Sequence, residues 1–533
     1  MGLIAEFEKR AQRFLIKEET PVSHWWIWFG AITLLGTILR FWDLGGAPIW
    51  MDEAVTLAFA RLDFGTIMWG NIDNHPNLTW MIQKLWHSIN PDPAHARVPV
   101  AVFGSLSVAA ILLATRDVAS ARAAIFTGLL FAVATCHIYY SQDARMYAYL
   151  IFGLILAVWG AIGHVRPRLC SPPMYAALYV LGGSIAIYSH AIGLIAMGMI
   201  GFASLAAGLY GDARHRFARD WFVRNLILFV ITLPWLVALP SASGTFPGII
   251  GDNSITDSVW FFRNATGFPG LDRFSLPFEA IYYGLSILAV PIALINGRRE
   301  LAFILLGLIL LYPAAMLIMH LRQPLLINRI FLPGLIGITI GVGYALSRLK
   351  PILMASIVAG CLALASFGST VTELKYHIKL EDYPGAYAYA SEQGVGDAPA
   401  LTCVHFQAAA AWENRPDGRT LYYRDGAVID YKGPEYWQAA KMSMSKLRIA
   451  EAHEIDAALG GGWLIEGGMK AALSNDNEVL FIRAFCDPGR EALIDTELKA
   501  LGFQEGQETL ITGNAADFVI LENPQTRITV YRR

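Results

Sequence analysis

Long apolar runs separated by short polar loops make up the first two-thirds of the chain. About eleven runs approach the roughly 20 residues that a helix needs to cross a membrane. They lie at 24–41, 98–115, 122–139, 146–163, 174–190, 191–210, 222–240, 278–296, 301–319, 329–346 and 351–369. From Thr370 onward, charged, polar and glycine residues return. The pattern predicts an α-helical polytopic membrane domain over 1–369, followed by a soluble α/β domain over 370–533.

The soluble part shows alternating helical and strand-like segments. Helices are expected at 383–393 and 487–501, and strands at 400–404, 463–465, 518–521 and 528–531. Cys403 and Cys486 both fall in this part. They can form a disulfide if the domain lies in an oxidising compartment, and otherwise they remain free thiols.

Composition and charge support a membrane location and indicate an orientation. The chain is 55% apolar and 16% charged with a net charge of −2, which gives no basic field for nucleic acid. Lys and Arg recur in alternate loops, and this bias marks the cytoplasmic side. We expect a multi-pass membrane protein with a cytoplasmic N-terminus, an amphipathic helix over Met1–Glu19 rather than a cleavable signal, and a C-terminal domain on the outer side of the membrane.

Two loops on the predicted outer side are unusually long. The first spans 42–97 and contains an apolar stretch, 77–89, which is too short to cross and is expected to lie in the interface. The second, 241–277, is rich in Gly, Pro and Phe and is expected to form an ordered loop or lid.

Ionisable and polar residues gather on this predicted outer face. Carboxylates and cations beside a bilayer are costly, and arginines on the outer side break the positive-inside tendency. The clusters are Asp52-Glu53, Asp73 with His75, Arg97, Asp143 with Arg145 and Tyr147, Ser189-His190, and Asn328-Arg329. One anionic ligand at the interface would explain the arginines together.

Each cluster also has a structural interpretation. Asp52 could be a helix N-cap with Glu53 in the first turn, and the segment around His75 could be only a turn. Arg97 and Arg145 could reach lipid headgroups, while His190 and Arg329 could make internal contacts. These interpretations do not explain why all the clusters share one face.

The clusters also form an ordered set of motifs. They are the acidic pair Asp52-Glu53, the segment Asp73-Asn74-His75-Pro76-Asn77-Leu78, Arg97-Val98-Pro99, the segment Tyr140–Tyr147, Tyr188-Ser189-His190, Arg329–Pro333 and Glu381–Ala386. This set resembles polyprenyl-phosphate-dependent glycosyltransferases of the GT-C class, especially bacterial relatives of protein O-mannosyltransferases and of lipid A aminoarabinose transferases. The sequence departs from the family at Asn77, where a second proline is usual, and this puts the geometry of that turn in question.

The resemblance implies transfer of a sugar (mannose-like, uronic acid or amino sugar) from a polyprenyl-phosphate donor to an envelope glycan, lipid or protein. In that case Asp52 is the general base, with Glu53 beside it as a tuning or positioning acid. Donor contacts would come from Asp73, His75, Arg97, Asp143, Arg145, Tyr147, His190 and Arg329. No metal is expected to be obligatory, and Asp52, Asp73 and His75 are the first candidates if a divalent ion binds. A lipid-linked-sugar flippase and a polysaccharide ligase with a diphosphate-lipid donor remain alternatives.

Overall fold

The structure is a computed structural model. It describes residues 22–533 except 70–74, 210–213, 243–256, 269–271, 322–326, 377–380, 425, 438–451, 484–485 and 512–525. The expected helix over Met1–Glu19 lies outside the described residues. The chain forms two compact units. The first, here called the helical unit, comprises Met1–Trp42, Val100–Val237 and Ile250–Leu374, and the second, the α/β unit, comprises Asp43–Pro99, Ala238–Ile249 and Lys375–Arg533.

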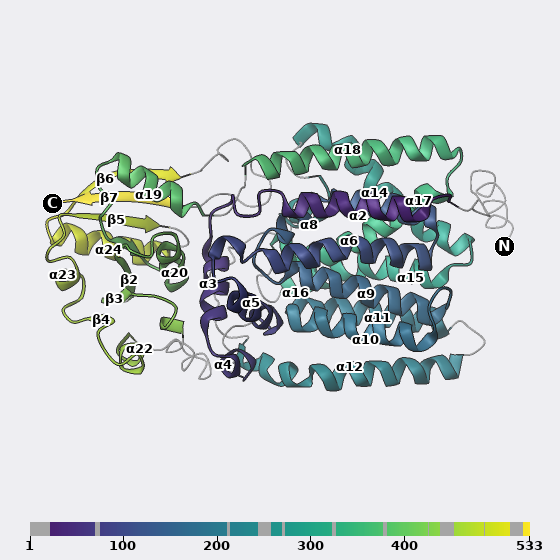
Figure 1. The fold of residues 1–533 in the computed structure, drawn as a ribbon, viewed down its shortest axis with the longest axis horizontal. Helices are drawn as coiled ribbons and strands as arrows, with labels where there is room; N and C mark the ends of the chain where they lie inside the picture. Colours follow the sequence, from purple (N-terminus) through teal and green to yellow (C-terminus); the bar gives the residue numbers. More distant parts are fainter. Residues whose placement is uncertain are drawn as a thin grey trace. The chain divides into compact units, whose positions relative to one another are not determined.

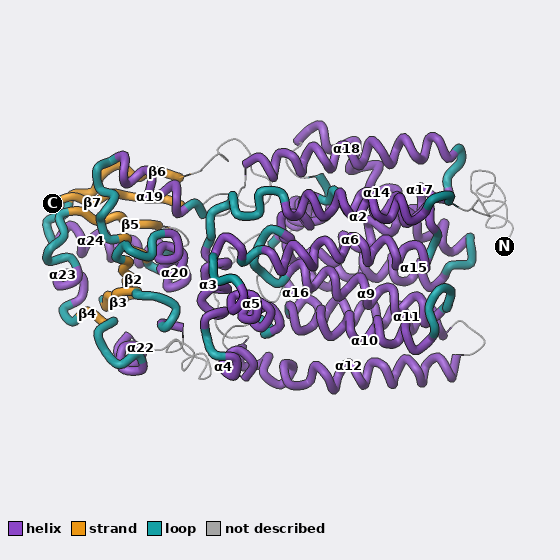
Figure 2. Tube along the Cα trace, in the orientation of Figure 1, coloured by secondary structure: helices purple, strands orange, loops and turns teal. Residues whose placement is uncertain are grey.

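The helical unit consists of helices, most of which run side by side in Figures 1 and 2. They are α2 (Trp25–Phe41), α6 (Val98–Val118), α7 (Ala121–Ala132), α8 (Thr135–Ser141), α9 (Tyr147–Val165), α10 (Pro172–Ser189), α11 (Ala191–Leu209), α12 (Arg214–Ala242), α13 (Asp257–Thr266), α14 (Asp272–Ile295), α15 (Arg299–Leu306), the π-helical η2 (Gly307–Leu311), α16 (Tyr312–His320), η3 (Asn328–Phe331), α17 (Leu332–Arg348) and α18 (Ile352–Tyr376).

Helices coincide with all eleven apolar runs, but fewer of them meet the length and hydropathy of a membrane span. Among the described residues eight helices do so, or nine if a bent pair counts as one span. That pair is α7 and α8, which meet at an angle of 61°, so the expected single span at 122–139 is broken. The helix α2, at 17 residues, is shorter than a typical span.

The break between α7 and α8 is stabilised by a buried arginine. Arg40 of α2 donates from Nη1 to Ala132 O at 3.1 Å and from Nη2 to Phe131 O at 3.3 Å. These carbonyls end α7 and have no partner within that helix. Arg40 Nη2 also lies 2.7 Å from His137 Nδ1 on α8. The guanidinium therefore supplies Ala132 O with a partner and adds a second donor to Phe131 O, which also accepts a hydrogen bond from Ala134 N at 3.3 Å.

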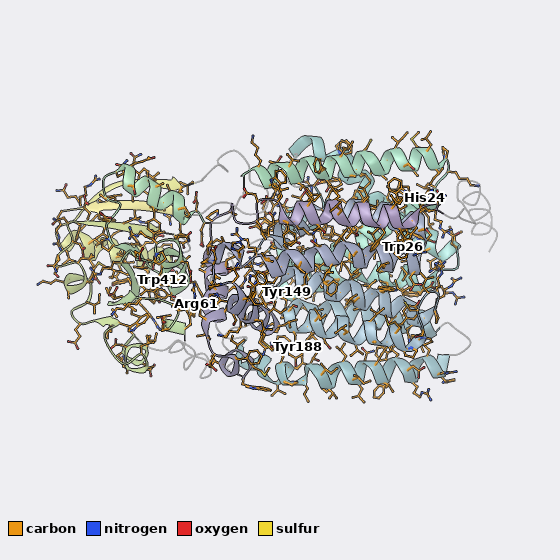
Figure 3. All side chains as sticks on the ribbon, in the orientation of Figure 1. His24, Trp26, Arg61, Tyr149, Tyr188 and Trp412 are labelled. Atoms are coloured by element: carbon orange, nitrogen blue, oxygen red, sulfur yellow. A yellow bond between two sulfur atoms is a disulfide. The ribbon has the colours of Figure 1, made fainter. Side chains whose placement is uncertain are left out.

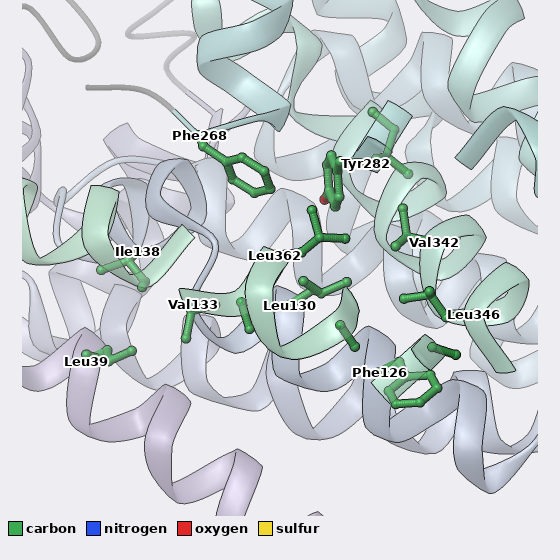
Figure 4. Packing of buried hydrophobic residues seen from close by; sticks show 14 of the residues in the cluster. Leu39, Phe126, Leu130, Val133, Ile138, Phe268, Tyr282, Val342, Leu346 and Leu362 are labelled. Carbon is green, nitrogen blue, oxygen red and sulfur yellow. The ribbon is translucent and has the colours of Figure 1, made fainter. Parts of the chain in front are cut away.

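The core of the helical unit surrounds α17, whose residues are all buried. Leu130 of α7, Tyr282 of α14, Val342 of α17 and Leu362 of α18 pack in one cluster (Figure 4). Gly343 allows α17 to approach α7 closely, because a Cβ at this position would lie 2.1 Å from Thr127 Oγ1. Small residues commonly permit such contacts between membrane helices, where tight packing replaces the hydrophobic effect.

The α/β unit contains one mixed sheet. Its strands are β1 (Ala400–Thr402), β2 (Thr420–Arg424), β3 (Ala427–Tyr431), β4 (Leu464–Ile465), β5 (Glu478–Arg483), β6 (Gln504–Ile511) and β7 (Thr526–Arg532). The order is β4-β3-β2-β1-β5-β7-β6, with β1 parallel to both β2 and β5 and the other pairs antiparallel. The helices of the C-terminal part are α19 (Tyr383–Glu392), α20 (His405–Asn414), α22 (Ala452–Ala458), α23 (Gly468–Ala472) and α24 (Pro488–Ala500).

The first long loop belongs to the α/β unit rather than to the helices that it connects. It forms α3 (Met51–Arg61), α4 (Phe64–Trp69), α5 (Leu78–Ile89) and the short 3-10 helix η1 (Pro93–His95). The amphipathic helix expected at 77–89 is present as α5, with Trp80 buried and Leu85 and Ile89 exposed. The predicted boundary at residue 370 lies close to Leu374, where the last segment of the helical unit ends.

Cys403 and Cys486 form a disulfide that joins the end of β1 to the start of α24. It closes a loop with a sequence separation of 83 residues. In the chain-entropy model, a crosslink of this length stabilises the folded domain by about 4 kcal/mol.

We therefore expect the Cys403→Ser, Cys486→Ser double variant to unfold more readily in the α/β unit by about 4 kcal/mol. The measurement is the rate of limited proteolysis of the C-terminal part in the full-length protein. Cys170→Ser, which removes a free cysteine, is the matched control. Equal proteolysis of all three proteins would contradict a stabilising role for the disulfide.

Candidate active site

The acidic pair lies in the first turn of α3. Trp50 is the N-cap residue, so Asp52 and Glu53 are the second and third residues of the helix. Asp52 is therefore not the N-cap, which was the alternative structural interpretation of this residue. Carboxylates in a first turn are stabilised by the helix dipole. The two side chains differ in burial, because Asp52 is partly exposed while Glu53 is fully buried.

Glu53 forms a bidentate ion pair with Arg97. Arg97 donates from Nε to Glu53 Oε1 at 2.7 Å and from Nη2 to Glu53 Oε2 at 2.5 Å. The other three donors of this guanidinium reach backbone carbonyls of the preceding segment, which are Leu44 O at 3.1 Å, Ala47 O at 2.9 Å and Pro48 O at 2.9 Å. A guanidinium has five N–H donors, and all five are used.

This pair accounts for Arg97 without an external anion. The side chains of Arg97 and Glu53 are 1% and 0% exposed, so the pair is an internal anchor between α3 and the start of α6. The two adjacent acids therefore have different environments. Glu53 is fixed by a cation, whereas the neighbouring Asp52 reaches the surface of the unit.

A third carboxylate holds the start of α3. Glu381 accepts a hydrogen bond from Met51 N at 2.9 Å and is fully buried. It satisfies one of the N–H groups that a helix N-terminus leaves unpaired, which Trp50 cannot do. Burial and the neighbouring charge of Glu381 raise the pKa of Tyr383 well above its ordinary value, so this phenol remains neutral.

The far end of α3 is fastened to α20. Arg61 forms an ion pair with Glu413 and lies over the ring of Trp412, with Arg61 Cζ 5.8 Å from the ring centroid (Figure 3). Phe59 packs edge-to-face against Trp437 at a centroid separation of 5.4 Å. The C-terminal part of the chain therefore holds both ends of the helix that carries Asp52.

The segment before α5 is only partly described. Asp73 lies outside the described residues, while His75 is described and partly buried. Asn77, where the sequence departs from the family, donates from Nδ2 to Met68 O at 2.9 Å. This bond ties the start of α5 to α4, so the asparagine has a local structural role at the turn.

Other predicted residues gather within the helical unit. Tyr147, which begins α9, has its ring 5.7 Å from that of His190 between α10 and α11. Arg329 Cζ lies 5.9 Å from the Tyr147 ring, and Arg145 and Arg329 both act electrostatically on His190. His190 Nδ1 accepts a hydrogen bond from Ile192 N at 3.1 Å, so its proton resides on Nε2 when the ring is neutral. Four residues from three distant segments thus form one cluster.

The segment between α8 and α9 is fixed by backbone contacts. Gln142 donates from Nε2 to Trp42 O at 2.8 Å, beyond the C-terminus of α2. Asp143 is fully buried, and its carbonyl accepts a hydrogen bond from Arg145 N at 2.5 Å. Sequence reasoning quoted Gln142 and Glu381 only as parts of motifs, and it missed Arg40. The signal for Arg40 was a charged residue at the end of an apolar run.

No group of three His, Cys, Asp or Glu side chains that could hold a metal ion occurs among the described residues. Asp73, one of the three residues considered as ligands of a divalent ion, lies outside the described residues.

Comparison with known proteins identifies the fold. No protein-family model and no curated protein sequence matches the chain. Among solved structures it is similar to ArnT from Cupriavidus metallidurans in the apo state, with a TM-score of 0.58 and 13% identity over 95% of this chain and 97% of that one. The same protein bound to undecaprenyl phosphate gives a TM-score of 0.53 and 13% identity over 96% and 98%. The expected GT-C type of fold is therefore confirmed.

Proposed function

We propose that this protein is a membrane glycosyltransferase that takes its sugar from a polyprenyl-phosphate donor. The observation that carries the proposal is the cluster of Arg145, Arg329, His190 and Tyr147 within a fold similar to ArnT. A solved ArnT structure contains undecaprenyl phosphate, which supports a lipid phosphate as part of the donor.

The arginine cluster suits a phosphate leaving group. Guanidinium groups form bidentate, charge-assisted hydrogen bonds with phosphate oxygens. When the bond between the sugar and the phosphate breaks, negative charge grows on the departing oxygen. Preorganised donors in a water-poor site stabilise that charge, and losing one such donor typically costs about 10²–10³ in rate. Arg145 and Arg329 are the residues proposed for this role.

Asp52 is the proposed general base. The acceptor hydroxyl or amine attacks the anomeric carbon of the sugar, the bond from that carbon to the phosphate oxygen breaks, and the acceptor proton passes to the Asp52 carboxylate. Polyprenyl phosphate leaves with the bonding electrons. A single displacement of this kind inverts the anomeric configuration and requires no covalent enzyme intermediate. Glu53, with its Arg97 partner, positions the base rather than sharing its task.

The proposed location is the outer face of a bacterial inner membrane. Short loops rich in Lys and Arg favour a cytoplasmic N-terminus. The Cys403–Cys486 disulfide favours an oxidising, periplasmic environment for the α/β unit. Cytosolic nucleotide sugars do not reach that compartment, and a lipid-linked donor does.

The test uses the purified full chain in vesicles with a panel of polyprenyl-phosphate-linked sugars, comprising a neutral hexose, a uronic acid and an amino sugar. Mass spectrometry measures the release of polyprenyl phosphate and the glycosylated acceptor. We expect Arg329→Gln to lower release at least about 100-fold, and Arg329→Lys to retain part of it. Arg216→Gln, an exposed arginine of α12, is the matched control.

The alternatives give different products in the same assay. A flippase would move the lipid across the bilayer without releasing polyprenyl phosphate, and a polysaccharide ligase would act only on a diphosphate-linked donor added to the panel, from which it would release polyprenyl diphosphate. Wild-type release by Arg329→Gln would show that this arginine does not stabilise the leaving group.

A further inference from the structure

Another buried arginine of the helical unit, Arg224, has no hydrogen-bond acceptor among the described residues. Arg224 on α12 is 2% exposed, and no described residue accepts a hydrogen bond from its Nε, Nη1 or Nη2. Its guanidinium packs against two rings, with Cζ 4.8 Å from the Tyr179 centroid and 5.7 Å from the Phe217 centroid. Ring contacts offset only part of the cost of burying a charge.

The comparison with Arg40 shows how unusual this is. Arg40 is also buried in the helical unit, but it donates to the carbonyls of Gly36, Ala132 and Phe131. The chain itself therefore supplies the Arg40 guanidinium with hydrogen-bond acceptors. Arg224, in contrast, contacts two aromatic rings and has no hydrogen-bond acceptor among the described residues.

His164, near the end of α9, meets the same aromatic ring. Its ring centroid lies 5.3 Å from that of Phe217, and Arg224 acts on it electrostatically. His164 Nδ1 is likewise buried without a partner among the residues that the structure describes. The Arg224 guanidinium and His164 Nδ1, which have no hydrogen-bond partner among the described residues, thus both lie beside Phe217.

Nearby polar groups are engaged elsewhere. Asp220, one turn before Arg224, acts electrostatically on Arg224 and His164, but its Oδ1 accepts hydrogen bonds from Arg219 Nε at 3.1 Å and Nη2 at 3.0 Å. Asn225 Oδ1 accepts a hydrogen bond from Tyr179 at 2.9 Å. Asp220 therefore places a negative charge near Arg224, but among the described residues no hydrogen bond joins the two side chains.

We propose that Arg224 and His164 bind a phosphate group, supplied by the headgroup of an anionic membrane lipid. Arginine pairs bidentately with phosphate, and basic pockets between membrane helices are typical sites for anionic headgroups. The outer surface of α12 offers contact for acyl chains, because Phe222, Leu226 and Val230 are 60%, 48% and 58% exposed. Phe217, partly exposed, covers the guanidinium and must move for the headgroup to enter.

This site is distinct from the proposed donor cluster. Tyr147 is the first residue of α9 and His164 the last but one. At a rise of 1.5 Å per residue they are about 25 Å apart along the helix axis. The bound lipid therefore has a role other than that of the substrate phosphate, and the proposal does not depend on the proposed function.

The test measures binding to the full-length, lipid-depleted protein in non-ionic detergent by native mass spectrometry. The probes are dihexanoyl phosphatidylglycerol, dihexanoyl phosphatidylcholine and inorganic phosphate. We expect phosphatidylglycerol to bind most tightly, and Arg224→Gln to weaken its affinity at least about tenfold, as expected for the loss of a charge-assisted contact. Arg216→Gln, an exposed arginine of the same helix, should change the affinity less than about twofold.

Competition by inorganic phosphate would show that the phosphate group alone suffices, whereas binding of phosphatidylglycerol without such competition would identify the lipid as the source. If Arg224→Gln does not fold, Arg224→Lys and His164→Gln replace it, each expected to weaken binding by about three- to tenfold. Unchanged affinity in the folded variants, or equal binding of both lipids, would overturn the proposal.

Discussion

Replacing Asp52 with asparagine is expected to lower sugar transfer by at least about 100-fold, because the acceptor would lose the carboxylate proposed to take its proton. Asparagine has nearly the same shape and remains compatible with the first turn of α3. The variant should therefore insert and fold as the wild type does. The measurement is the initial rate of transfer with saturating donor, together with the thermal unfolding midpoint.

A second aspartate of the same loop provides the control. Asp92 is exposed and caps η1 by accepting a hydrogen bond from Ala94 N at 3.0 Å. Asn is almost as good an N-cap as Asp, so Asp92→Asn should leave both rate and stability near wild type. Transfer by Asp52→Asn at more than a tenth of the wild-type rate would remove Asp52 from the role of base.

Glu53→Gln is expected to destabilise the α/β unit by about 3–5 kcal/mol, because the buried Arg97 loses the charge that compensates it. This variant should lose transfer and folding together, whereas Asp52→Asn should lose transfer alone. Chemical unfolding of the full chain, followed by proteolysis of the first long loop, measures the loss.

The double variant Glu53→Gln, Arg97→Gln tests whether the two residues stabilise the protein through their ion pair or independently of each other. If the ion pair is the source of the effect, the double variant should be clearly more stable than the sum of the two single losses predicts. Additive losses would mean that Glu53 and Arg97 stabilise the loop independently.

The sequence predicted where the helices of the membrane part lie, but it did not predict that one of them is broken. Hydropathy identifies apolar segments, but it carries no information about a bend inside one. The break after Ala132 depends on Arg40, whose partners lie 91 and 92 residues away. In the soluble part, β6 was missed because most of its residues, Gln504–Ile511, are exposed and polar and lack the alternation of a half-buried strand.

The polar clusters were found from the sequence, but their partners were not. Tyr147, His190, Arg145 and Arg329 lie in one cluster of the helical unit. Arg97, in contrast, pairs with Glu53, 44 residues earlier, and Met51 is held by Glu381, 330 residues later. Such pairings arise from tertiary structure, and one sequence without a fold does not reveal them.

The attachment of α3 to the C-terminal part has a consequence for building chimeric enzymes. Residues 375–533 look like an exchangeable module, yet Glu381 and Glu413 within them hold the helix that carries Asp52. A chimera that takes only this C-terminal segment from a relative would leave Met51 and Arg61 facing foreign residues. Grafting 43–99 together with 375–533 preserves both contacts, so the helix that carries the proposed base keeps the partners that hold it.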